Sequence, residues 1–367
     1  MTAPAGDGAR ATPARRPTIK DIARRAGVSE SAVSFALNGR PGVSQTTRER
    51  VHRVAADLGW QPNSAARALS GERSGALGLV LARPAHTLGV ESFFLQLVSG
   101  VQEVLAARKI ALLFQVVEDT AAECELLRRW WAERRVDGVL VVDPRAQDPR
   151  PALLDSLGLP AVLVGAPAPG EDAGSLSTVW ADDSAAMASV LAHLHGLGHR
   201  RIVHVAGLAG LAHTERRIAS LRAEAAALGL SGVRSVTTDY SDAEGAAATR
   251  RLLDAAEPPT AIIYDNDVMA VAGVSAAAER GVALPAELSV VAWDDSALCR
   301  VTHPRLTALV RDTTAFGRLA ARELLDRLDG GPARSVQAEL PHLEPRESTA
   351  PPPPAEREPA PEQGLRA

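Results

Sequence analysis

The sequence predicts a small all-α unit at the N-terminus, followed by a larger α/β unit built on two parallel β-sheets. Two observations lead to this fold class. Residues 18–60 contain three short amphipathic helical patterns separated by turn residues. Beyond residue 75, apolar strand-like runs alternate with helical segments, which is the pattern of parallel sheets covered by helices. The length of 367 residues also favours more than one compact unit.

The three N-terminal helices have recognisable start and stop signals. The first opens at Thr18, in a capping-box-like sequence, and ends at Gly27. The second has Ser29 as its N-cap, and the third opens at Ser44 and runs to Gly59. We therefore expect a compact three-helix unit over residues 17–62.

The α/β unit is predicted over residues 76–345. Helical patterns, for example residues 93–107 and 185–197, separate its strands. Open parallel sheets bind ligands at the carboxyl ends of their strands, so we expect a ligand cleft between two subdomains. The predicted strands are residues 77–81, 110–117, 138–142, 161–164, 202–206, 261–264 and 288–292.

The charge is unevenly distributed along the chain. Residues 1–73 carry 12 Lys/Arg against 6 Asp/Glu, whereas residues 74–367 carry 28 against 38. A basic module attached to an acidic body indicates that the small unit binds a polyanion. The two cysteines match no metal or disulfide spacing, and no run of about 18 apolar residues occurs. We expect a cytoplasmic protein without a membrane segment or a cofactor.

Both ends of the chain are polar, rich in proline and aperiodic. Residues 1–16 and 346–367 have the composition of disordered tails, and we exclude them from the predicted fold. The C-terminal tail offers no apolar heptads for a tetramer-forming helix. We expect a homodimer that forms through the α/β unit.

The stretch from Thr18 to Asn38 resembles the DNA-binding headpiece of the LacI/GalR family of transcriptional regulators. The resemblance continues through residues 43–48 and 59–63, and so covers the module nearly residue by residue. A tight turn at Gly27 would let the second helix enter a major groove as part of a helix-turn-helix. By the resemblance, the DNA-binding residues are Thr18, Ser29, Glu30, Ser31, Ser34, Asn38, Ser44 and Thr47.

The resemblance divides these residues into two roles. Glu30, Ser31 and Ser34 would read bases, and the other five would contact phosphates. The Glu30 carboxylate can accept a hydrogen bond from cytosine N4 but is repelled by phosphate. Phe35 departs from the lac-type members, which have arginine there, so the outer bases of the operator should differ. An ordinary helical hairpin is the alternative reading of this segment.

Residues 63–73 resemble the family hinge, which becomes helical on the operator. Asn63 belongs to this stretch, and small Ala66 would allow two hinge helices to pack closely. Leu69 resembles the apolar wedge that opens the central base step of the minor groove. Such a hinge implies a dimer on a pseudo-palindromic operator. A simple linker helix is the alternative.

Residues 76–349 resemble the periplasmic-binding-protein-like core of the same regulators, most strongly in residues 193–202, 215–217, 265–270 and 289–295. The resemblance implies a small polar effector, in particular a sugar, that releases the repressor from its operator. Sugar sites combine hydrogen-bonding side chains with an apolar or aromatic face. By the resemblance, the ligand-binding residues are Phe94, Arg217, Asn266, Trp293 and Asp294. Phe93 is a further candidate for the aromatic face.

Some residues depart from the family pattern or allow another role. Gly165 stands where lac-type members have aspartate, and Ser220 replaces a glycine. The loop of residues 82–92 is unusual. A surface ion pair is the alternative role for Arg217 and for Asp294, and helix capping is the alternative for Asp265 and Asp267.

Three other functions are alternatives for this sequence. An enzyme would have to use the clustered ligands His193, His195, His199 and His204 with Asp182 or Asp183, but no HExxH or phosphate-loop motif accompanies them. A secreted solute-binding protein would need an export signal and has no use for a headpiece. A regulator that needs a purine-like corepressor remains the main alternative. We expect no catalytic residues and no metal site.

Overall fold

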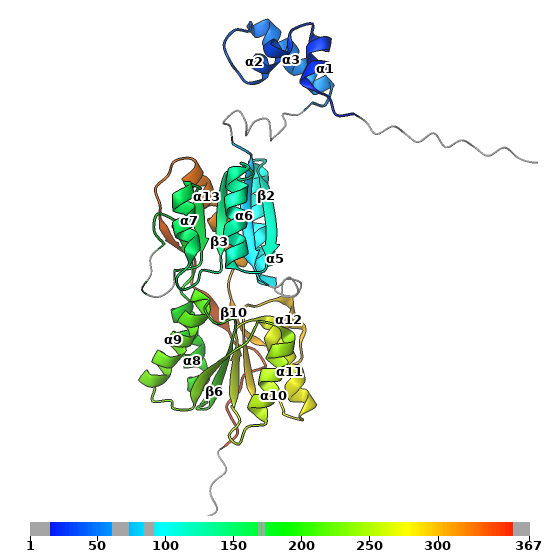
Figure 1. Ribbon diagram of the computed structural model, residues 1–367. Helices are drawn as coiled ribbons and strands as arrows, with labels where there is room; N and C mark the ends of the chain where they lie inside the picture. Colours follow the sequence, from blue (N-terminus) through cyan, green and yellow to red (C-terminus); the bar gives the residue numbers. More distant parts are fainter. Residues whose placement is uncertain (1–14, 61–72, 84–91, 168–169, 171–172, 355–367) are drawn as a thin grey trace, which may run out of the picture. The chain divides into compact units, whose positions relative to one another are not determined.

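The computed structural model describes residues 15–60, 73–83, 92–167, 170 and 173–354 (Figure 1). The chain divides into two compact units, residues 1–72 and residues 73–367. The expected hinge residues Asn63, Ala66 and Leu69 lie outside the described residues.

The first unit consists of α1 (Ile19–Ala26), α2 (Glu30–Leu37) and α3 (Gln45–Asp57). All three predicted helices are therefore present. Thr18 and Asp21 form a reciprocal capping box at the start of α1, and Gly27 ends that helix with a φ of 65°. The apolar faces of the three helices meet in one small core made of Ile22, Ala23, Ala26, Val33, Ala36, Val51 and Ala55.

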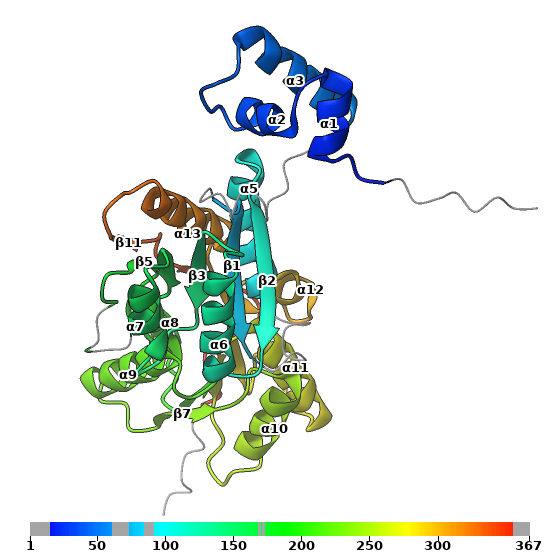
Figure 2. The same ribbon diagram turned by 45° about the horizontal axis from the view of Figure 1, so that its top comes forward.

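The second unit contains two sheets, as the sequence predicts, and each of them has six strands among the described residues. In the N-subdomain the strand order is β11-β5-β4-β3-β1-β2, and all pairs are parallel. Helices α5 and α13 cover one face of this sheet, and α6 and α7 cover the other (Figure 2). The elements are β1 (Ala76–Ala82), α5 (Ser92–Ala107), β2 (Ala111–Val117), α6 (Thr120–Ala132), β3 (Gly138–Val142), α7 (Pro149–Leu157), β4 (Ala161–Val164), β5 (Ser177–Trp180), α13 (Thr313–Leu328) and β11 (Ser335–Gln337).

The C-subdomain sheet has the order β12-β10-β9-β8-β6-β7, with only the β10–β12 pair antiparallel among the described strands. Helices α8 and α9 pack on one face, and α10 and α11 on the other. The elements are α8 (Asp183–Gly196), β6 (Ile202–Ala206), α9 (Ala212–Ala227), β7 (Val233–Thr237), α10 (Asp242–Leu253), β8 (Ala261–Tyr264), α11 (Asp267–Glu279), β9 (Ser289–Trp293), α12 (Ala297–Val301), β10 (Thr307–Val310) and β12 (His342–Glu344).

The chain crosses between the two subdomains three times. The crossings follow β5, β10 and β11. Because the strands of both sheets end toward these crossings, the loops after the strands of one subdomain face those of the other (Figure 1). Residues from both sets of loops line a cleft.

The structure corrects the expected start of the C-terminal tail. Residues 346–350 are not a free tail, because they run beside β9 and β10. The buried Ser348 Oγ donates to Val290 O at 2.6 Å and accepts from Thr307 N at 2.8 Å. Arg346 binds both carboxylate oxygens of Asp295. Because residues 346–350 are mostly polar and show no strand periodicity, the sequence pattern did not predict these contacts.

Candidate functional site

Serine hydroxyls cap the N-termini of α2 and α3 in the first unit. Ser29 caps α2 by accepting from Ala32 N at 3.2 Å, and its hydroxyl also contacts Ser31 Oγ at 2.9 Å. Ser44 caps α3 through Thr47 N and Thr47 Oγ1. Two helix N-termini with hydroxyl caps offer backbone N–H groups to phosphates.

The remaining expected DNA-binding residues belong to the same unit. Glu30 is exposed at the first turn of α2, and Asn38 Nδ2 donates to Ser34 Oγ at 3.4 Å. The Phe35 side chain remains 38% exposed. The Thr18 hydroxyl, in contrast, donates to the Asp21 carboxylate within the capping box.

The exposed cations of this unit were not assigned from the sequence. Arg48 has a structural role in this unit, because its guanidinium donates to Ala36 O and Arg40 O and so fixes the α2–α3 loop. The exposed basic side chains are Arg15, Arg16, Lys20, Arg24, Arg25, Arg40, Arg50 and Arg53. This basic surface suits the phosphate backbone of a nucleic acid.

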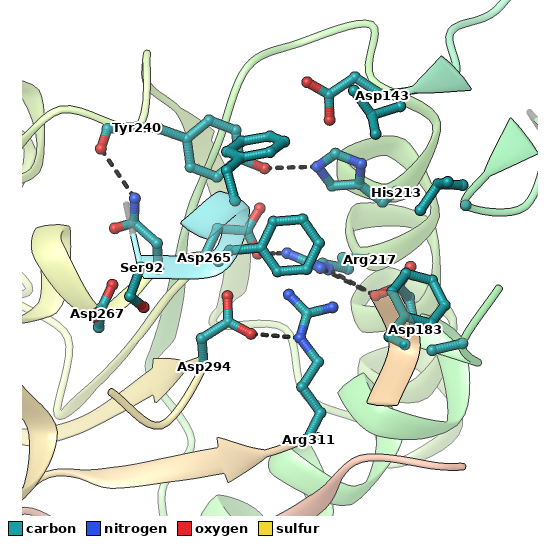
Figure 3. A pocket seen from close by; sticks show the side chains of 18 of the residues that line it. Ser92, Asp143, Asp183, His213, Arg217, Tyr240, Asp265, Asp267, Asp294 and Arg311 are labelled. Carbon is teal, nitrogen blue, oxygen red and sulfur yellow. Dashed lines mark hydrogen bonds and ion pairs between the residues drawn. The ribbon is translucent and has the colours of Figure 1, made fainter. Parts of the chain in front are cut away.

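A second site lies in the cleft of the α/β unit. It encloses about 90 Å³ and is lined from both subdomains at the carboxyl ends of β1, β3, β8, β9 and β10 (Figure 3). Several polar side chains occupy the first position after a strand, where parallel sheets bind ligands. Those side chains are Arg83, Asp143, Asp265, Asp294 and Arg311.

Arg83 and Asp143 form a buried ion pair on the N-subdomain side. Arg83 Nε donates to Asp143 Oδ2 at 2.6 Å, and the guanidinium lies between the rings of Phe94 and Tyr240 at 5.0 and 4.9 Å. Asp143 has a φ of 53°, and Arg150 supports it by donating to its carbonyl oxygen. Burial would raise the pKa of Asp143, but Arg83 holds it below its ordinary value.

Arg217 is the centre of the polar network on the C-subdomain side. It donates to Asp183 and to Asp265, in both cases at 3.0 Å. Asp265 also accepts from Gly207 N. Burial opposes ionisation of Asp265, yet Arg217 and His204 keep its pKa well below the ordinary value. Arg217 is therefore buried and paired rather than a surface residue.

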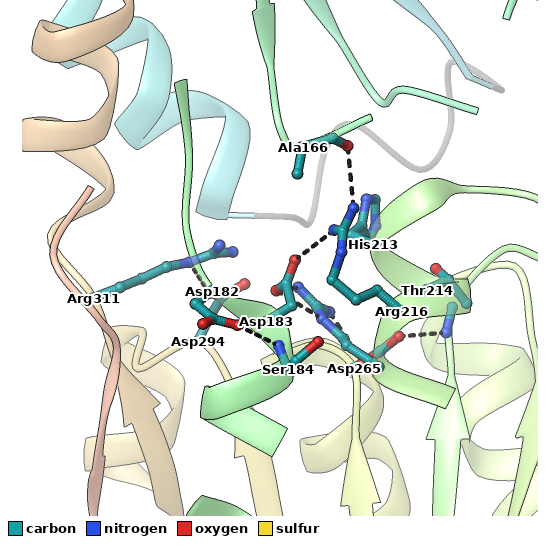
Figure 4. A network of polar contacts seen from close by, with 12 residues as sticks. Ala166, Asp182, Asp183, Ser184, His213, Thr214, Arg216, Asp265, Asp294 and Arg311 are labelled. Atoms are coloured by element: carbon teal, nitrogen blue, oxygen red, sulfur yellow. Dashed lines mark hydrogen bonds and ion pairs between the residues drawn. The ribbon is translucent and has the colours of Figure 1, made fainter. Parts of the chain in front are cut away.

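Arg216 connects this network to the other subdomain. Its Nη2 donates to Ala166 O at 3.3 Å and to Pro167 O at 2.6 Å, in the loop that follows β4 (Figure 4). Its Nη1 lies 3.5 Å from Asp183. Movement of the two subdomains would therefore disturb the partners of Arg217.

His213 and Tyr240 form another part of the lining. His213 Nε2 lies 2.9 Å from the Tyr240 hydroxyl. Burial, reinforced by the charge of Arg217, lowers the pKa of His213 to about 4. The imidazole is thus neutral at pH 7 and can exchange hydrogen bonds with a neutral ligand.

Asp294 and Arg311 face each other at 2.6 Å from the ends of β9 and β10. Asp294 has a φ of 73°, which is strained for a residue with a side chain. Arg311 also lies 4.5 Å from the centroid of the Phe93 ring. Next to this pair, Asp267 Oδ2 is buried without a hydrogen-bond partner, and burial raises the pKa of that carboxyl.

The structure places four of the five expected ligand residues on the cleft. Phe94, Arg217, Asn266 and Asp294 line it. Asn266 also caps α11 by accepting from Met269 N at 2.8 Å. Trp293 does not line the cleft, because its side chain is 1% exposed and belongs to the core under α8 and α9. The expectation that Trp293 offers its ring to a ligand is therefore wrong in this structure.

Sequence reasoning missed Arg83, Asp143, Tyr240 and Arg311 as lining residues. Three of them are the first polar residue after an apolar strand, so that position alone was a usable signal. Tyr240 had no such signal, because it comes from the loop after β7, a strand that the periodicity did not reveal.

The histidine cluster has structural roles. His199 binds the hydroxyls of Thr260 and Ser289, and His204 binds Asp265. In the part of the chain that the structure describes, no cluster of His, Cys, Asp or Glu could hold a metal ion. The described helices include none with the length and apolar content needed to cross a membrane.

Comparisons with known proteins find relatives for both units of the chain. Residues 18–63 match bacterial regulatory proteins of the lacI family, and residues 191–349 match a periplasmic binding protein-like domain. The transcriptional regulator CelR of Thermobifida fusca is 34% identical over 91% of this chain and 98% of its own length. The structure of a CelR–cellobiose complex has a TM-score of 0.68 at 31% identity, covering 91% of this chain and all of that one. A LacI family regulator from Bifidobacterium animalis has a TM-score of 0.70 at 36% identity, covering 77% of this chain and all of that one.

Proposed function

The chain belongs to the LacI family of bacterial transcriptional regulators, and from this premise we propose that it is a dimeric repressor released from its operator by a neutral sugar. DNA binding through the helix-turn-helix is the function that its relatives share. The observation that carries the effector assignment is the cleft, in which arginine–aspartate pairs and aromatic rings meet at the carboxyl ends of parallel strands.

The chemistry of the cleft supports a sugar over a purine-like corepressor. Its arginines are each matched by an aspartate, so a ligand finds hydrogen-bonding groups without a large net charge. Phe94 and Tyr240 are already covered by Arg83, so among the described residues these two rings do not form a parallel pair that could sandwich a purine. The CelR–cellobiose complex makes cellobiose the first probe to test.

Dimer formation is supported by apolar side chains that the single chain leaves in water. Val301 and Leu298 on α12 are 76% and 41% exposed, and Leu95 on α5 is 70% exposed. Large exposed apolar residues are typical of an interface. A dimer would place two headpieces on a pseudo-palindromic operator, with Asn63, Ala66 and Leu69 as the paired hinge residues.

Two further parts of the proposal follow from DNA binding. We infer that the chain works in the cytoplasm, where chromosomal DNA is found. We also infer that it catalyses no reaction, because His199 and His204, two of the clustered histidines that an enzyme would use, are engaged in structural hydrogen bonds.

The test begins with selection of an operator from random duplex DNA by the full chain. Fluorescence anisotropy then measures operator affinity with cellobiose, maltose, lactose, glucose, guanine or hypoxanthine. A sugar that weakens operator binding supports the proposal, and couplings of this kind are about 5- to 150-fold. If a purine strengthens operator binding and no sugar of the panel changes it, the corepressor alternative would instead be established.

A further inference from the structure

The Arg311–Asp294 pair differs from the other ion pairs of the cleft in how much of it remains unbound. The Nε, Nη1 and Nη2 atoms of Arg217 all donate to Asp183 or Asp265. Arg311 approaches Asp294 through Nε, and its two terminal nitrogens have no hydrogen bond to a described residue. These terminal nitrogens face the cleft (Figure 3).

The acceptors beside Arg311 are also incompletely satisfied. Asp294 Oδ1 and Arg311 Nε are in ionic contact, but their alignment does not make a hydrogen bond. Asp267 Oδ2, which also lines the cleft, makes no well-aligned hydrogen bond to a described residue, and the Ser296 hydroxyl only partly stabilises its carboxylate. Buried polar atoms without partners are costly, so native proteins retain them mainly where a ligand or water completes the set.

The net charge of this corner of the cleft is zero or negative. Arg311 contributes one positive charge and Asp294 one negative charge, while Asp267 is a second carboxyl in the same lining. A lone arginine would attract a carboxylate or phosphate, but an arginine that already faces a carboxylate does not. Donors and acceptors lie side by side here, and adjacent hydroxyls, which both donate and accept, match that arrangement.

We propose that Arg311 and Asp294 act as one charge-neutral recognition pair, which binds adjacent hydroxyls of an uncharged sugar and selects against its anionic counterpart. This proposal rests on the proposed effector cleft and adds a specificity determinant to it. Arg311 donates through its terminal nitrogens, Asp294 accepts, and the Phe93 ring packs against the guanidinium.

The test is a charge-swap cycle in the full chain. Asp294→Asn, Arg311→Gln and the double variant are compared with the parent by calorimetry. The ligands are cellobiose and cellobiouronic acid, or the sugar of the panel above that binds the parent best together with its uronic acid. The measured quantity is the ratio of the two dissociation constants, which reports selectivity rather than folding.

The expected parent prefers the neutral sugar by at least tenfold. Asp294→Asn unmasks the Arg311 charge and should shift this ratio at least tenfold toward the uronic acid. Arg311→Gln should weaken neutral sugar binding at least tenfold and disfavour the acid further. The double variant is neutral again, so its ratio should return toward that of the parent.

A matched ion pair supplies the control. Arg280 and Asp254 form an exposed pair at 2.7 Å in the same subdomain, and Asp254→Asn with Arg280→Gln should leave the ratio unchanged. If Asp294→Asn abolishes all binding, Arg311→Lys decides the matter, because it keeps the charge and should keep the parental preference.

The outcomes separate this inference from the proposed function. Equal selectivity in the parent, Asp294→Asn and Arg311→Gln, with affinity alone reduced, would overturn the recognition pair and leave the sugar cleft standing. The same conclusion follows if Arg311→Lys loses the preference. A parent that binds no neutral sugar of the panel would overturn both.

Discussion

The guanidinium of Arg217 lies 4.0 Å from the centroid of the Trp293 ring, and the same guanidinium binds Asp183 and Asp265. The Trp293 indole therefore packs beneath the guanidinium of Arg217 and does not offer its face to the cleft. A cation held over an aromatic face and between two carboxylates has little freedom to move. We therefore expect Trp293 to influence effector binding only through Arg217.

Replacing Trp293 by leucine should damage stability and effector binding together. Truncating a buried aromatic side chain costs about 3–5 kcal/mol when the residue becomes alanine, and leucine should cost somewhat less. Urea denaturation measures the loss, and calorimetry should show at least a tenfold weaker effector complex. Trp131→Leu is the control, since that indole is 46% exposed on α6. Parental effector affinity in Trp293→Leu would contradict the supporting role.

All three polar ligand residues that the sequence predicts line the cleft, whereas only one of the two predicted aromatic ones does. Asp294 and Asn266 follow clear apolar strands, so their place at the strand ends can be deduced from the pattern. Trp293 ends a strand that is buried on both faces, and such strands lack the polar alternation that would show which side the indole takes. The side of Trp293 depends on tertiary packing.

The missed strands have a related physical cause. β5, β10, β11 and β12 have only three or four residues, and β7 mixes polar with apolar residues. Such segments become strands because a neighbouring strand offers hydrogen bonds. The local periodicity of the sequence does not show which strand will be the neighbour. The three helices of the headpiece, in contrast, carry their own caps, and their limits were predictable.

Close packing of α5 against α13 should make Gly317 intolerant of alanine. A Cβ at Gly317 would lie 2.2 Å from Leu97 O, a backbone atom that cannot move alone. Gly317→Ala should therefore lower the free energy of unfolding by about 1–3 kcal/mol or more. Gly196→Ala is the control, because a Cβ on that α8 residue meets nothing within 4 Å. Equal urea midpoints for the two variants would contradict this packing.

His213 should make the protein less stable in mild acid. Burial lowers its pKa from 6.5 to about 4, so the unfolded chain takes up a proton that the folded chain refuses. Above pH 6.5 the imidazole is neutral in both states and does not change the free energy of unfolding. As the pH falls from 6.5 toward 4, protonation of the unfolded state lowers that free energy by up to about 3 kcal/mol. In urea titrations from pH 7 to 4, His213→Gln should lose less stability than the parent. Exposed His303→Gln is the matched control and should follow the parent curve.

Leu69→Ala should weaken operator binding while leaving effector binding intact. This prediction comes from the hinge-like sequence, in which the leucine is expected to open a base step in bent DNA. Anisotropy with the selected operator, at one fixed salt concentration, measures the effect. Equal operator affinity for variant and parent would remove the hinge assignment.

Asp294→Ala should uncouple the effector from the operator. The variant keeps the headpiece unchanged, so it should bind the operator like the parent. Its cleft loses the carboxylate that accepts sugar hydroxyls and leaves Arg311 without its partner, which costs more than removing an exposed charge. Coupling between the two ligands is reciprocal and typically about 1–3 kcal/mol, so the parent shows equal factors in both directions. In Asp294→Ala both factors should approach one, which makes it a permanent repressor. A parental response to the effector in operator titrations of Asp294→Ala would show that the effector binds elsewhere.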